Sequence, residues 1–127
     1  MKTKRPVNLD IGSIKLPITS YVSILHRVSG VVLFFAVALL LWMFDASLES
    51  EQSFQSLKEC LSSPIAQLVI WAALAALAYH FVAGIRHLIM DFGFGEESFE
   101  SGRRSAWVVV AVAAIVIASI SGWIFLW

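Results

Sequence analysis

The sequence predicts an all-α integral membrane protein with three transmembrane helices. Of its 127 residues, 59% are hydrophobic and only 14% are charged, a composition far more apolar than that of a soluble domain. Three stretches also lack charged residues over lengths that suit a membrane span, since a bilayer has about 30 Å of hydrocarbon and a helix needs about 20 residues to cross it. Together these observations disfavour a water-soluble fold.

The charge-free stretches set the expected helices. They run from Val28 to Phe44, from Pro64 to Ile85 and from Ser105 to Trp127. With their flanks included, the helices are expected at residues 21–45, 64–90 and 104–127. We therefore expect an N-terminal segment, residues 1–20, followed by a single three-helix membrane domain, residues 21–127.

The first helix is expected to begin ahead of its charge-free stretch. That stretch is short for a span, and residues 21–25 before it are mostly apolar. A helix that includes them carries His26 and Arg27 into the lipid interface, where long polar side chains can reach water.

Positive charge is concentrated on one side of the expected helices. The segment ahead of the first helix and the loop after the second are rich in lysine and arginine, whereas the loop after the first helix has one lysine, Lys58. Because positively charged loops stay inside the cell, we expect a cytoplasmic N-terminus and a periplasmic C-terminus. No cleavage site for a signal peptide follows the first span and no transit segment precedes it, so we expect a bacterial inner membrane.

Several classes of function are excluded or disfavoured. The net charge is zero, which gives no indication of nucleic-acid binding. The single cysteine, Cys60, excludes an intrachain disulfide and a multi-thiolate metal site made by this chain alone, and we expect it to be an inert thiol. The sequence has no phosphate-binding loop, nucleophile elbow or metalloprotease motif, so we do not expect the chain to be an enzyme on its own.

His80 is the most costly polar residue in the expected spans. It lies about five residues, or roughly 8 Å, inside the end of the second apolar stretch, where burying an ionised group costs about 2.5 kcal/mol or more. A neutral imidazole needs a partner for each ring nitrogen, and a metal on one with a carbonyl or carboxylate on the other satisfies both. Haem iron meets this need, and so does a hydrogen bond to another helix.

Neighbouring residues fit a haem beside His80. Gly84, one turn on, has no side chain and would let a flat porphyrin lie close, while Arg86 and His87 could meet its propionates. His26 and His87 lie too near the interface to be a second axial ligand, so we expect that ligand from another chain. Rows of small residues would let another helix approach: Ala72, Ala76 and Gly84 on the second helix, and Ala114, Ala118 and Gly122 on the third.

Ser23 and Arg27 form a second candidate site. They lie one turn apart at the start of the first helix. A quinone headgroup has two carbonyl oxygens that need hydrogen-bond donors and become more negative as electrons arrive, so a hydroxyl and a guanidinium suit it. The alternative is that Arg27 only reaches toward lipid phosphates.

Three segments resemble the cytochrome b subunits of succinate dehydrogenase. They are RPVNL at residues 5–9, SILHRVSG at 23–30 and HFVAGIRHLIMDFG at 80–93. The two longer motifs occur in the family's order, each on an expected helix, and the resemblance covers nearly the whole chain.

The resemblance implies roles for single residues. His80 would be an axial ligand of haem b, and a histidine of a second small membrane subunit would be the other, with the helices of both chains forming a bundle around the haem. Ser23 and Arg27 would line the ubiquinone pocket. The remaining haem-pocket or propionate contacts would be His26, Arg27, Gly84 and His87.

The resemblance also implies partners and a task. A flavoprotein would oxidise succinate in the tricarboxylic acid cycle, and an iron–sulfur subunit would pass the electrons to ubiquinone in the respiratory chain. This chain would hold both soluble subunits at the membrane lipid, ligate the haem and form part of the quinone site. Two alternatives stay open: the anchor of a quinol:fumarate reductase, and a structural anchor without cofactor. A small transporter is disfavoured because the chain has no internal repeat and no broken helix.

Overall fold

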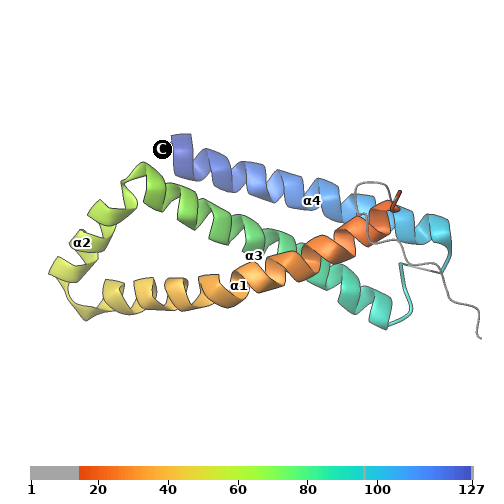
Figure 1. Ribbon diagram of the computed structural model, residues 1–127, viewed down its shortest axis with the longest axis horizontal. Coiled ribbons are helices and arrows are strands. Elements are labelled where there is room, and N and C mark those ends of the chain that lie inside the picture. Colours follow the sequence, from red (N-terminus) through yellow and green to blue (C-terminus); the bar gives the residue numbers. More distant parts are fainter. Residues whose placement is uncertain (1–14, 96, 127) are drawn as a thin grey trace, which may run out of the picture.

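The computed structural model describes residues 15–95 and 97–126, and in this part of the chain it is all helical (Figure 1). Its four helices are α1 (Ile18–Glu49), α2 (Glu51–Leu61), α3 (Pro64–Asp91) and α4 (Phe99–Leu126). Of these, α1, α3 and α4 are long and apolar enough to cross a membrane. The expected class, an all-α membrane protein with three spans, is therefore confirmed.

The short helix α2 lies where the sequence indicated only a loop. Ser50, in extended backbone, caps it by accepting a hydrogen bond from Ser53 N to its Oγ at 2.9 Å. Glu51 in its first turn and Lys58 in its last suit the charges of the helix dipole. Figure 1 shows α2 joining the far ends of α1 and α3.

The spanning helices extend beyond their expected ends because polar side chains support the extra turns. α1 begins directly after Pro17 and continues to Glu49, and the Ser53 hydroxyl donates to the free Ala46 carbonyl at 2.7 Å. α4 begins five residues before the expected 104, since Ser98 Oγ accepts from the Ser101 backbone N–H at 3.0 Å. α3 begins at Pro64, as expected, after the capping residue Ser63.

Small residues form the contacts among the three spans. Near one end, Val22 of α1 and Ala83 of α3 pack with Ala106 and Val109 of α4. A second cluster of buried residues joins α1 and α3: Leu33, Ala36 and Ala73. Because no hydrophobic effect drives helices together in lipid, close approach of small side chains is the main source of packing energy.

Large apolar side chains point outward. Phe34 is 78% exposed and Ile115 is 67% exposed, so these helix faces are open to lipid or to another membrane chain. Ala114 and Ala118 of the expected small-residue row on α4 are also exposed, whereas Ala76 on α3 packs inside against α1. Trp107 and Trp123 lie exposed near the ends of α4, and Trp127 falls outside the described residues.

The first prediction concerns the three-helix contact. Ala83 has no exposed surface, so Ala83→Leu should force α3 away from α1 and α4 and destabilise the fold by about 1–3 kcal/mol. Thermal unfolding in detergent micelles, followed by circular dichroism, measures this. Ala111→Leu adds the same atoms at an exposed position of α4. It should leave the free energy of unfolding within about 0.5 kcal/mol of the parent value. Equal midpoints for the two variants would contradict the packing.

Candidate functional site

The candidate residues gather toward one end of the bundle. There α1 begins, α3 ends and α4 begins. We call this the basic end because it holds every arginine that the structure describes: Arg27, Arg86, Arg103 and Arg104. It also holds Ser23 and the three histidines.

His80 of α3 is bonded to α1 through one ring nitrogen. Its Nδ1 lies 3.1 Å from the carbonyl oxygen of His26 and 3.1 Å from Ser29 Oγ. The Ser29 hydroxyl in turn donates to the same His26 carbonyl at 2.8 Å. Ser29 is buried. The His80 ring, the Ser29 hydroxyl and the His26 carbonyl therefore bond to one another between the two helices.

This arrangement selects the tautomer of His80. A carbonyl oxygen only accepts hydrogen bonds, and the single Ser29 hydrogen is already directed at that carbonyl. The proton of the neutral His80 ring therefore belongs on Nδ1, and Nε2 keeps a free lone pair. An imidazole whose Nδ1–H is held by a backbone carbonyl is the form that ligates a metal through Nε2.

The other two histidines lie beside His80. The ring of His26 stacks on that of His80 with centroids 4.2 Å apart and planes 13° apart, and the ring of His87 lies 4.7 Å from His26. His87 Nε2 is buried and has no hydrogen-bond partner among the residues that the structure describes. A buried donor or acceptor of this kind costs about 1–3 kcal/mol until it is paired, so it favours a ligand or a partner chain at this position.

Two glycines make room for these rings. A Cβ on Gly30 would lie 3.2 Å from His80 Cε1, so α1 can approach His80 this closely only without a side chain at position 30. A Cβ on Gly84 would lie 3.5 Å from His26 Nε2. The space beside Gly84 that was expected to hold a porphyrin holds the His26 imidazole, and a porphyrin contact at Gly84 stays a prediction.

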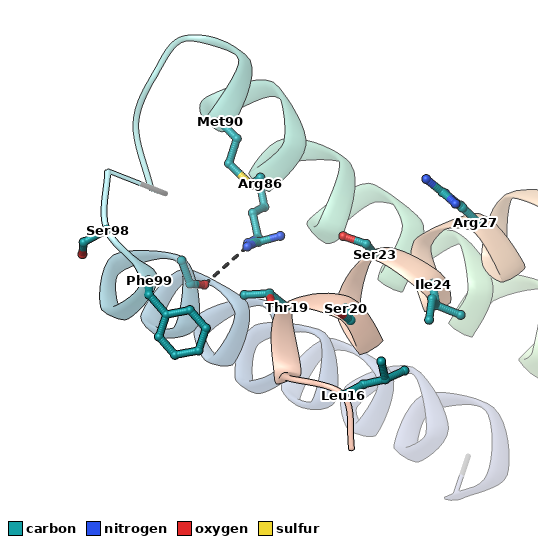
Figure 2. A pocket seen from close by; sticks show the side chains of 11 residues that line it. Leu16, Thr19, Ser20, Ser23, Ile24, Arg27, Arg86, Met90, Ser98 and Phe99 are labelled. Atoms are coloured by element: carbon teal, nitrogen blue, oxygen red, sulfur yellow. Dashed lines mark hydrogen bonds between the residues drawn. The ribbon is translucent and has the colours of Figure 1, made fainter. Parts of the chain in front are cut away.

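Ser23 and Arg27 line one cavity at the basic end. The cavity has a volume of about 550 Å³ and opens between the start of α1, the end of α3 and the start of α4. Figure 2 shows the Ser23 hydroxyl directed toward the guanidinium of Arg86, with Arg27 farther along α1. The other residues that line the cavity are Leu16, Thr19, Ser20, Ile24, Met90, Ser98, Phe99 and Gly102. No acidic residue is among these, so the cavity suits a ligand with electron-rich oxygens.

Arg86 is the polar residue whose environment the sequence did not reveal. From the sequence it was expected only as a possible contact for haem propionates, and in the structure it is buried, with 5% of its surface exposed. Its Nε donates to Ser105 Oγ at 3.0 Å and its Nη2 to the Gly102 carbonyl at 3.3 Å. Only the packing of α4 buries this side chain, and the charge-free stretch of α3 ends before it.

Metal ligands do not gather into a separate site. Within residues 15–95 and 97–126, no three histidine, cysteine or acidic side chains are placed to hold one ion. A haem needs only one protein ligand on each face, which His80 can supply on one of them.

Comparisons with known proteins identify chains that are similar to this one. The family of succinate dehydrogenase/fumarate reductase transmembrane subunits matches residues 1–120. The chain is 40% identical to the succinate dehydrogenase cytochrome b556 subunit of Coxiella burnetii, over 98% of this chain and 100% of the relative. It is 36% identical to that of Rickettsia felis, over 89% and 87%, and 28% identical to that of Paracoccus denitrificans, over 88% and 85%.

The second prediction concerns the proton on His80. Nitrogen-15 solid-state NMR of the histidine-labelled protein in bilayers, without added cofactor, should show His80 as the neutral tautomer protonated at Nδ1. The signal is assigned by its loss in His80→Gln. Ser29→Ala should leave the tautomer unchanged because the His26 carbonyl still accepts the proton. A His80 ring protonated at Nε2 would contradict the hydrogen bonding described.

Proposed function

Because this chain belongs to the succinate dehydrogenase/fumarate reductase transmembrane subunit family, we propose that it anchors a succinate dehydrogenase and serves as its cytochrome b subunit. In this proposal it ligates haem b and forms part of the site where ubiquinone is reduced. The observation that carries the proposal is the bond from His80 Nδ1 to the His26 carbonyl, which leaves Nε2 free to bind iron.

Haem b would be held between this chain and a second small membrane subunit. His80 would hold the haem iron from this chain, and the ring of His26 is stacked beside that of His80. A second ligand would come from the other subunit, which can approach the exposed small residues of α4. His26, Arg27 and His87 are the donors available to the propionates. The haem, when bound, supplies a centre that accepts and returns one electron.

Ubiquinone would bind in the 550 Å³ cavity at the basic end. Ser23 donates its hydroxyl hydrogen to one quinone oxygen, and Arg27 lies one turn away with a fixed positive charge. As electrons reach the quinone, its oxygens gain negative charge, and both groups hold them more tightly. Arginine is too weak an acid to give up a proton, so the protons that complete the quinol come from water or from partner groups.

The chain performs no succinate chemistry in this proposal. A flavoprotein subunit oxidises succinate, and an iron–sulfur subunit carries the electrons to the basic end. The distribution of lysine and arginine supports a cytoplasmic basic end in a bacterial inner membrane, with the N-terminus inside and the C-terminus in the periplasm. The cavity then opens on the side where soluble subunits would dock.

The same family includes fumarate reductase subunits, so the anchor of a quinol:fumarate reductase is the second candidate. It would use the same residues in the opposite direction. The potentials of the bound haem and of the native quinone decide between the two directions.

The third prediction concerns haem. The dithionite-reduced minus oxidised spectrum of membranes that carry this chain with its native partners should show a b-type haem band. His80→Ala should abolish or shift the band because it removes the axial ligand. A cofactor-free anchor predicts altered assembly and no band in either sample. A band that is unchanged in His80→Ala would refute ligation by His80.

The fourth prediction concerns the quinone site. Ser23→Ala should raise the KM for a short-chain ubiquinone by about fivefold to tenfold, since one hydrogen bond to the headgroup is worth about 1 kcal/mol or more. Arg27→Gln should also lower kcat, because its charge matters most as the quinone becomes negative. The matched control is Ser119→Ala, which removes an exposed hydroxyl that bonds within α4. The proposed site is wrong if neither variant differs from this control.

A further inference from the structure

Arg86 is a buried cation whose charge no carboxylate balances in the part of the chain that the structure describes. It is 95% buried, because only 5% of its surface is exposed. The ion pair found among the described residues joins Arg104 and Glu100 on the outer surface of α4. Arg86 instead rests on neutral acceptors, the Ser105 hydroxyl and the Gly102 carbonyl. Burying a guanidinium is costly, so a neutral cage with an unused donor favours a further ligand.

One nitrogen of Arg86 remains free. Nη1 is shielded from solvent and has no hydrogen-bond partner among the described residues. Since Nε and Nη2 are both held by the first turns of α4, the plane of the guanidinium is fixed and Nη1 cannot turn to another acceptor. The contacts that fasten α3 to α4 use Nε and Nη2 and leave Nη1 unused.

Arg86 belongs to the lining of the cavity that Ser23 and Arg27 share. In Figure 2 its guanidinium points from α3 into the space between Ser23, Thr19 and Phe99. Hydrogen-bond donors thus line the cavity from two helices. Ser23 and Arg27 belong to α1, and Arg86 belongs to α3. A headgroup with oxygens on opposite edges of a ring is suited to donors on two different helices.

We propose that Arg86 is a third binding residue for the quinone headgroup and that its Nη1 donates a hydrogen bond to a ring oxygen. This inference rests on the quinone site proposed above and adds a residue to it. Ser105 is then a positioning residue: its Oγ accepts from Arg86 Nε, and its single hydrogen is shared between the carbonyls of Gly95 and Gly102. It acts on the quinone only through Arg86.

The test measures quinone kinetics of the whole complex in its native membrane. Arg86→Gln should lower kcat/KM for a short-chain ubiquinone by about tenfold, mostly through KM, because one charge-assisted hydrogen bond is lost. Arg86→Lys keeps the charge without the fixed fork and should give a smaller loss. Succinate oxidation with a water-soluble dye, which bypasses the quinone, should stay unchanged in both variants.

The matched control is Arg104→Gln. Arg104 is an exposed arginine on α4 whose partner is Glu100, and its loss should not change the quinone KM. Ser105→Ala leaves Nη1 in place but loosens the guanidinium, so its KM should lie between those of the parent and Arg86→Gln. If Arg86 only fastens α3 to α4, all variants at positions 86 and 105 will lower the amount of assembled complex and leave KM unchanged. That result overturns the inference.

Failure of this inference differs from failure of the quinone site itself. A normal KM in Arg86→Gln beside a raised KM in Ser23→Ala refutes the role of Arg86 alone. Normal KM values in both, and in Arg27→Gln, refute the site. If Arg86→Gln instead loses bound anionic phospholipid from the purified complex while KM is unchanged, Nη1 binds a lipid phosphate and the inference is overturned.

Discussion

The contact between His80 and the backbone of α1 is the interaction on which the arrangement of the basic end depends. A polar group between helices in hydrocarbon cannot form hydrogen bonds with water, so its hydrogen-bond partners must be other groups of the bundle. Here one carbonyl, that of His26, receives both the Ser29 hydroxyl and the His80 ring. The bond fixes the rotation of α3 against α1, and with it the side on which Nε2 is left free. The same contact favours Gly30, because a Cβ there would lie 3.2 Å from His80 Cε1 and would crowd the imidazole.

The basic end combines two electrostatic environments at short range. The rings of His26 and His80 stack between α1 and α3, with His87 tilted beside His26. Arg27, Arg86 and several hydroxyls line the adjoining cavity. A single helix face cannot provide both, since neighbours in sequence point about 100° apart around the helix. His26 and Arg27 show this separation: the His26 ring faces His80, and the Arg27 side chain lines the cavity. The imidazoles and the cavity can therefore lie side by side on different faces of α1.

The three spans and the candidate residue His80 could be predicted from the sequence because polar groups in a membrane span are energetically costly. The spans follow from charge-free runs, and His80 was identified by the cost of an imidazole among apolar neighbours. The burial of Arg86 could not be predicted from the sequence, because it depends on how α4 folds back over the end of α3. The Gly102 carbonyl and the Ser105 hydroxyl that bind it lie at least 16 residues away along the chain. The stacking of His26 on His80 and the filling of the space beside Gly84 likewise depend on the crossing of two helices, which residue spacing within one helix does not determine. α2 could not be predicted from the hydrophobic pattern, because its few apolar residues are separated by serines and charges.

The short helix α2 also gives the chain an intrinsic chemical reporter. Cys60 is the single cysteine of the sequence, and it is exposed on α2, at the end of the bundle opposite the arginines. A thiol on a well-formed helix outside the spans is accessible to maleimides from one aqueous compartment only. Labelling of intact cells with a reagent that cannot cross lipid would thus read the topology of the native chain without any engineered tag or inserted cysteine.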